Sequence, residues 1–131
     1  MKLFGQSRKE LGDLGEKVAA EYLHRHGFLI VAHNVARKTG EIDLIARKDK
    51  IMHFVEVKTI ACEAFPGEQH TLDEYDPSVN LHEAKIRKVA RTAEWYMAER
   101  DLENEWQVDA VLVWLRKRDG RAYVRYLPQI V

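Results

Sequence analysis

The sequence predicts an α/β domain with a mixed sheet of about five strands flanked by helices, in the order α-β-β-β-α-β-β. Two stretches carry apolar residues at helical spacing, and the others are rich in β-branched or aromatic residues and bounded by turn signals. With 131 residues, of which 46% are hydrophobic and 32% charged, the chain can bury the core of one domain. We therefore expect a single domain over residues 1–131.

The first helix and first strand are predicted near the N-terminus. Apolar residues recur at spacings of three and four, and a glycine at position 27 supplies a stop. The members of this stripe are Leu11, Leu14, Val18, Ala19, Tyr22 and Leu23. The short apolar run Phe28–Ala32 predicts a buried strand, followed by the polar segment Asn34–Thr39. The helix is expected to pack on the sheet that this strand enters.

A β-hairpin is predicted in the middle of the first half. Glu41–Ala46 and Ile51–Thr59 have strand character, and Arg47–Lys50 between them has the composition of a turn. Side chains alternate between the two faces of each strand, so the register decides which residues meet. With the turn centred between Asp49 and Lys50, the numbers of opposed residues sum to 99.

This register has a chemical consequence, because it places Asp43 opposite Glu56 and Glu41 opposite Lys58. Directly opposed like charges destabilise a sheet. A hard divalent cation such as Mg²⁺ or Mn²⁺ offsets that repulsion, since it binds carboxylate oxygens. Asp43 and Glu56 are therefore predicted metal ligands. Lys58 is then a predicted catalytic residue that orients or deprotonates an attacking water, or stabilises charge on a phosphate.

The alternative is that these charged residues form the solvated face of an ordinary hairpin. Ile45 and Phe54 share that face and are apolar, which indicates that the face is covered by another element. Acidic residues under such a cover are less ordinary than acidic residues in water. The hairpin is therefore the best candidate for a functional site.

An acidic loop and a basic helix are expected next. Cys62–Asn80 lacks a convincing period, and from Glu63 to Glu83 there are six acidic residues with no lysine or arginine. Asn80 is the predicted N-cap of a second helix that runs to about Arg100. Its start is basic, which indicates either a nucleic-acid-binding surface or a solvated helix face. The residues concerned are Lys85, Arg87, Lys88 and Arg91.

The last two strands are predicted at Trp106–Leu115 and Ala122–Leu127, joined by a turn that contains Asp119-Gly120. Trp95, Trp106 and Trp114 fall on or beside periodic segments. They are therefore interpreted as core or interface residues and not as base-stacking platforms.

Composition limits the class of protein. The single cysteine, Cys62, and the lack of a signal peptide or a long apolar run predict a soluble cytoplasmic protein that does not enter membranes. The 21 basic residues equal the 21 acidic residues, so nucleic-acid binding must depend on local patches.

At the hairpin the sequence resembles the PD-(D/E)XK nuclease superfamily, with Asp43 as the first acid and Glu56-Val57-Lys58 as the acid-x-lysine element. More closely, it resembles the YraN-like bacterial proteins, known as uncharacterised protein family 0102. The residues that match are Gly15-Glu16, Ala19, Tyr22, Leu23, Gly27-Phe28, Asn34, Gly40–Ala46 and Phe54–Thr59, with Lys85 and Asp109 as looser matches.

This resemblance implies a restriction-endonuclease-like core and kinship with archaeal Holliday-junction resolvases. It implies that Glu16, on the first helix, assists the metal site, and that the substrate is DNA more than RNA, including branched or recombining DNA. Resolvase kinship also brings a homodimer into consideration. Ile60, which stands where related sequences carry a basic residue, and the acidic loop support two alternatives. These are a catalytically silent nucleic-acid-binding module, and a protein-interaction subunit that uses Trp106, Trp114 and the loop.

Overall fold

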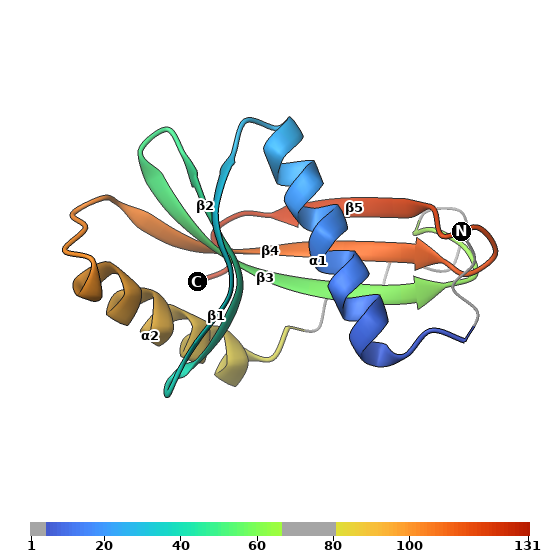
Figure 1. The fold of residues 1–131 in the computed structure, drawn as a ribbon, viewed down its shortest axis with the longest axis horizontal. Helices are drawn as coiled ribbons and strands as arrows, with labels where there is room; N and C mark the ends of the chain where they lie inside the picture. The colour runs from blue at the N-terminus through green and yellow to red at the C-terminus, as the bar shows by residue number, and fades with distance from the viewer. Residues whose placement is uncertain (1–4, 67–80) are drawn as a thin grey trace.

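The computed structural model describes residues 5–66 and 81–131, and it contains two helices and five strands in the predicted order (Figure 1). The elements are α1 (Arg8–Arg25), β1 (Leu29–Arg37), β2 (Gly40–Lys48), β3 (Ile51–Cys62), α2 (Glu83–Glu99), β4 (Trp106–Arg116) and β5 (Ala122–Leu127). The strands form one sheet in the order β1-β2-β3-β4-β5. All strand pairs are antiparallel except β3 with β4, which confirms the predicted mixed sheet. The crossover connection that joins these two parallel strands contains α2.

The two helices cover opposite faces of the sheet. Along β3, Val55 belongs to the core cluster beneath α1, whereas its neighbour Phe54 belongs to the cluster beneath α2. Because consecutive strand residues point to opposite faces, each face has its own core. Figure 1 shows α1 crossing the sheet and α2 lying beside β1 and β2. The expectation that the first helix packs on the sheet, and that another element covers Phe54, is confirmed.

The first strand differs from the prediction. It begins at Leu29 and continues to Arg37, into the polar segment that was predicted to follow the strand. It is the edge strand and not a buried one: Leu29 is 53% exposed, and Val31 is also exposed. An apolar run does not distinguish a central strand from an edge strand, because burial also requires a neighbour on each side. The buried residue of the predicted run is Phe28, which precedes the strand.

The second helix also begins differently. Its N-cap residue is His82, which makes no side-chain capping hydrogen bond, so the predicted cap at Asn80 is wrong. The helix ends at Glu99, close to the predicted end. Asn80 and most of the predicted acidic loop, 67–80, lie outside the described residues.

The register of the central hairpin is as predicted from the turn to Leu44 and Val55, but the predicted pairs of Asp43 with Glu56 and of Glu41 with Lys58 lie beyond the end of the ladder. Leu44 pairs with Val55 and Lys48 with Ile51, so the opposed numbers sum to 99. Asp49 and Lys50 form the two-residue turn, with φ of 52° and 67°. Two positive φ angles are what a tight type I′ hairpin turn requires. Within the described residues, neither helix is long and apolar enough to cross a membrane.

Candidate functional site

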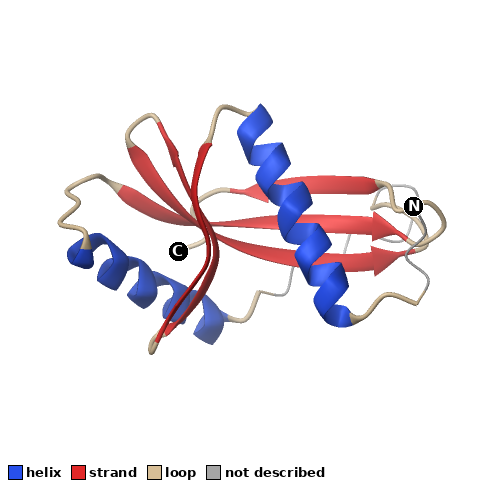
Figure 2. Cartoon of the chain, viewed as in Figure 1, coloured by secondary structure: helices blue, strands red, loops and turns tan. Residues whose placement is uncertain are grey.

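The strands of the central hairpin separate at the predicted site. The ladder between β2 and β3 ends at Leu44 and Val55, whereas β3 remains paired with β4 as far as Cys62. Figure 2 shows β1 and β2 curving away from the flatter run of β3, β4 and β5. Asp43 is the first residue beyond the ladder, and its Oδ2 accepts a hydrogen bond of 2.8 Å from the Val57 N–H. The Asp43 side chain therefore takes the place of a main-chain partner and holds its carboxylate beside β3.

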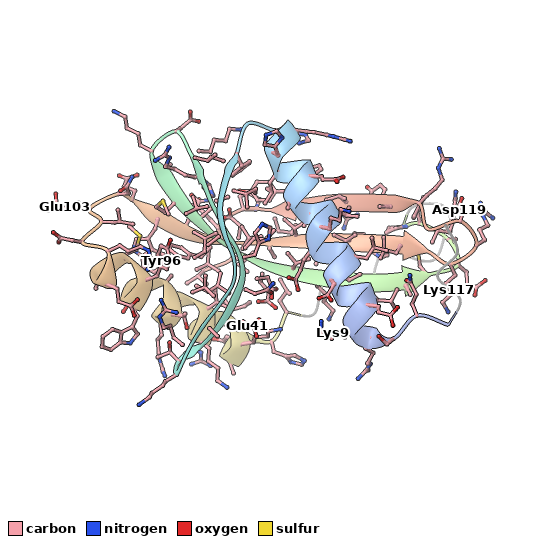
Figure 3. The ribbon with its side chains drawn as sticks, in the orientation of Figure 1. Lys9, Glu41, Tyr96, Glu103, Lys117 and Asp119 are labelled. Carbon is pink, nitrogen blue, oxygen red and sulfur yellow. The ribbon has the colours of Figure 1, made fainter. Side chains whose placement is uncertain are left out.

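A cleft of about 470 Å³ opens where the strands separate. It lies between β2, β3 and the N-terminal turns of α2, and Figure 3 shows Glu41 beside that part of the helix. The residues that line it are Gly40, Glu41, Asp43, Glu56, His82, Ala84, Lys85, Lys88 and Val89. Gly40 has φ of 150°, and a β-carbon there would approach Lys88 Cβ to 3.2 Å. A glycine thus lets the hairpin approach the helix closely.

Glu56 is the most deeply buried acid of this cleft, with 3% of its surface exposed. Its Oε1 lies 2.6 Å from Lys85 Nζ, while Oε2 has no hydrogen-bond partner among the described residues. Burial and the nearby Asp43 charge together raise the pKa of Glu56 to about 7, although Lys85 opposes the shift. Burial likewise raises the pKa of Asp43 against the Val57 N–H and the Lys85 charge. The buried Glu56 and the half-buried Asp43 therefore share the neutralising charge of Lys85.

The donor set fits a hard divalent cation. Mg²⁺ is usually bound by one or two carboxylates together with water, and it repays the cost of two neighbouring negative charges. The unpaired Glu56 Oε2 is a buried acceptor that such a cation would satisfy. Within residues 5–66 and 81–131, no three His, Cys, Asp or Glu side chains gather as metal ligands. A cation held by Asp43 and Glu56 would thus complete its shell with water and substrate oxygens.

Glu16 lies near this pair but borders different depressions. It lines two shallow hollows beside α1, of about 480 and 360 Å³, and not the cleft itself. Burial raises the pKa of Glu16, the Asp43 charge raises it further, and a hydrogen bond with Asn34 opposes both effects. Glu16 is therefore coupled electrostatically to Asp43 from the other side of the hairpin.

Asn34 and Gly15 are site residues that sequence reasoning did not assign. Asn34 is in the left-handed region, with φ of 49°, and lies between the paired residues His33 and Val35 on β1. Gly15 allows α1 to approach β3, because a β-carbon there would lie 1.7 Å from Thr59 Oγ1. A left-handed asparagine within a strand and a glycine within a helix are the sequence signals for such positions, and both belong to the matched motif.

The two predicted lysines have different positions. Lys58 is half-buried on β3, two residues beyond Glu56 and thus on the same side of the strand, but it is not among the residues that line the cleft. Lys85, predicted as a phosphate contact, instead makes the ion pair with Glu56. This pair raises the pKa of Lys85, mainly through the hydrogen bond to Glu56. The cation that neutralises the acids therefore comes from α2.

The other predicted nucleic-acid contacts lie along α2. Lys88 lines the cleft, whereas Arg87 lies 3.9 Å from Glu83 on the exposed surface, and Arg91 is exposed farther along the helix. Trp106 is partly buried against the core and Trp114 is 4% exposed. Trp114 is therefore not available as the partner surface of the protein-interaction alternative, whereas Trp106 remains partly exposed.

Comparison with known proteins gives one family. The model of uncharacterised protein family UPF0102 matches residues 15–113. A UPF0102 protein of Sulfurovum sp. strain NBC37-1 is 36% identical over 106 residues, covering 80% of this chain and 84% of the relative. One from Syntrophotalea carbinolica is 35% identical over 122 residues, covering 92% and 90%. One from Campylobacter jejuni strain 81-176 is 35% identical over 102 residues, covering 78% and 81%.

Proposed function

The chain belongs to uncharacterised protein family UPF0102, and from the geometry of its cleft we propose that it is a metal-dependent nuclease that hydrolyses phosphodiester bonds in DNA, including branched or recombining DNA. One observation carries the proposal. Asp43 and Glu56 come from separating strands into one cleft, where a buried carboxylate oxygen of Glu56 has no partner among the described residues. The resemblance of these positions to the PD-(D/E)XK motif supports the same chemistry.

Each residue has a distinct part in this proposal. Asp43 and Glu56 would hold Mg²⁺ or Mn²⁺, which when bound polarises phosphate oxygens and lowers the pKa of water. Lys58 orients the attacking water or the phosphate, and Glu16 assists from the α1 side. In the reaction the water oxygen bonds to phosphorus, the ester P–O bond breaks, and the departing oxygen takes up a proton. No electron transfer is required.

The N-terminus of α2 supplies the binding site for the DNA backbone. Lys85 and Lys88 line the cleft from the first turns of this helix, where exposed main-chain N–H groups also favour anions. The side chain of Lys85 is 63% exposed although its Nζ lies against Glu56, so it can contact solvent or a phosphate. This local charge compensates for the zero net charge of the whole chain.

Cleavage assays test the proposal. Single-stranded, duplex and junction DNA are incubated with the protein and Mg²⁺ or Mn²⁺, and products are resolved on gels. We expect the cleavage rates of Asp43→Asn and Glu56→Gln to fall by more than about 100-fold, because loss of a residue that hydrogen-bonds to a metal ligand already costs up to roughly that factor. Glu103→Gln is the matched control, because Glu103 is exposed and lies on the loop after α2, away from the cleft (Figure 3). Equal cleavage by Asp43→Asn and the unaltered protein would refute the assignment.

One observation favours a second candidate, a nucleic-acid-binding module without turnover. In the structure Lys85 Nζ already neutralises Glu56 at 2.6 Å, which is a role that a metal would otherwise fill. For this candidate we expect DNA affinity that falls steeply with salt, no cleavage with either metal, and no loss of affinity on chelation. Metal-dependent product formation that Glu56→Gln abolishes would exclude it.

A further inference from the structure

Helix α2 exposes a tryptophan that the proposed cleavage chemistry does not use. Trp95 is 57% exposed, and among the described residues of α2 it is the one large apolar side chain on the surface. The sequence interpretation placed the three tryptophans in a core or an interface, and the exposure of Trp95 excludes the core for this residue. The periodic apolar stripe of α2 is instead formed by Val89, Ala93, Tyr96 and Met97, which are buried.

The surroundings of Trp95 are basic and not apolar. Arg91 lies one turn before it and Lys88 about two turns before it, so the three share one side of the helix. Lys88 also lines the carboxylate cleft. On the following turn Glu99 is bound by Arg37 at 2.9 Å, so its charge is neutralised. We name the side formed by Lys88, Arg91 and Trp95 the basic face of α2.

The basic face begins at the cleft, because Lys88 belongs to both, and it continues along α2 beside the β1–β2 turn, whose Thr39 Oγ1 lies 2.7 Å from Thr92 Oγ1. With a rise of about 1.5 Å per residue, Trp95 lies about 15 Å along the helix axis from Lys85. At the roughly 3.4 Å spacing of stacked nucleotides along one strand, this distance corresponds to about four nucleotides, and to fewer in a stretched strand. A strand whose phosphate occupies the cleft can therefore present a nearby base to the indole ring.

Resting on the proposed function, we infer that the basic face of α2 binds an unpaired nucleotide of the substrate, with its base stacked on Trp95 and its phosphates beside Lys88 and Arg91. Stacking requires an unpaired base, because a base within a duplex does not present its ring face. A docking surface for protein would instead require a contiguous apolar patch, and the turn before Trp95 offers Arg91. The inferred substrate is thus DNA with a single-stranded segment within about four nucleotides of the cleft.

Equilibrium binding of the full-length protein tests this inference. With EDTA present to prevent turnover, fluorescence anisotropy measures the affinity for a blunt duplex and for the same duplex with an overhang of about five nucleotides. We expect the unaltered protein to prefer the overhang. Since stacking on one aromatic side chain contributes about 1–3 kcal/mol per base, Trp95→Ala should reduce the ratio of the two affinities by about 5- to 150-fold. Trp95→Phe keeps an aromatic ring and should therefore retain most of the preference for the overhang.

Leu29→Ala is the control, because Leu29 is also an exposed apolar residue but lies on the edge strand β1. The ratio of the affinities of this variant for the overhang and the blunt duplex should equal that of the unaltered protein. An unchanged ratio in Trp95→Ala would overturn the inference, as would equal affinity of the unaltered protein for both DNAs. Cleavage together with either result would leave the proposed nuclease function standing. A Trp95-dependent preference without any cleavage would support the inference and refute the nuclease. Absence of binding to both DNAs would overturn the inference, and the cleavage assays with Mg²⁺ or Mn²⁺ would then decide the nuclease function separately.

Discussion

Two buried carboxylates on neighbouring parallel strands have opposite electrostatic properties. Glu56 on β3 is 3% exposed and Asp109 on β4 is 0% exposed, and their strands pair in register, with Val55 beside Asp109. The pKa of Glu56 is raised to about 7, while that of Asp109 is lowered below its ordinary value. Burial therefore does not decide the charge state by itself, and the difference lies in the hydrogen-bond donors around each acid.

Asp109 is fully supplied with donors. Burial alone would raise its pKa, but four hydrogen bonds to the ionised form outweigh that effect. His53 Nδ1 and the Tyr126 hydroxyl lie 2.6 and 2.7 Å from Oδ2, and the Gln107 amide and the Gln129 N–H lie 2.8 and 2.9 Å from Oδ1. These partners come from β3, β4, β5 and the C-terminal segment. Asp109 is thus the centre of a network that connects them.

Glu56 has fewer donors at a similar depth. Lys85 contacts one of its oxygens, the neighbouring Asp43 adds a second negative charge, and Oε2 has no partner among the described residues. A half-satisfied buried acid is costly, so its presence calls for a ligand that completes it. Asp109 therefore stabilises the fold, whereas Glu56 borders the cleft and costs stability.

The largest effect is expected from removing Asp109. Asp109→Ala leaves the buried His53 and the half-buried Tyr126 without their acceptor, and at about 1–3 kcal/mol for each unsatisfied donor the two together cost about 2–6 kcal/mol. Urea unfolding should show a free energy of unfolding lowered by about that amount at neutral pH. Asp109→Asn, which keeps the shape and one acceptor oxygen, should cost less. A change below about 0.5 kcal/mol in Asp109→Ala would mean that the network does not stabilise the fold.

Replacing Glu56 should raise the free energy of unfolding, whereas replacing Asp109 lowers it, and the gain should depend on pH. A carboxyl whose pKa is raised by folding costs nothing below its ordinary pKa of 4.5, and its cost grows until pH exceeds about 7. In EDTA, Glu56→Gln should therefore gain about 3.5 kcal/mol of folding stability relative to the unaltered protein between pH 4 and pH 8, since one pKa unit corresponds to about 1.4 kcal/mol. Urea unfolding across this range measures the difference. A difference that does not vary with pH would show that Glu56 titrates normally.

The sequence predicted that Asp43 and Glu56 lie near each other because the register of the hairpin follows from local rules. The two-residue turn at Asp49 and Lys50 fixes the register, and the register fixes which side chains oppose each other. The network at Asp109 was not predictable in this way. Its partners His53, Tyr126 and Gln129 are 56, 17 and 20 residues away in sequence; the parallel pairing of β3 with β4 brings His53, and the antiparallel pairing of β4 with β5 brings the other two.

The same limit explains the remaining differences. The pairing of Lys85 with Glu56 depends on how α2 packs over the sheet, which periodicity does not specify. The exposure of β1 depends on its place at the sheet edge, and the exposure of Trp95 depends on which face of α2 is buried. Sequence pattern thus predicted the elements and the motif, whereas the ion pair, the edge strand and the buried network came from the tertiary arrangement.

The smallest expected effect concerns metal binding, and it separates the two acids by function. A cation that binds only the folded state stabilises it by about 1.4 kcal/mol at ten times its Kd. Mn²⁺ should therefore raise the Tm of the unaltered protein, and Asp43→Asn and Glu56→Gln should remove that shift. Asp109→Asn should start from a lower Tm and retain the shift, because Asp109 is absent from the cleft lining. Loss of the shift in Asp109→Asn alone would reverse the roles assigned here, since the metal would then depend on the satisfied acid and not on the unsatisfied one.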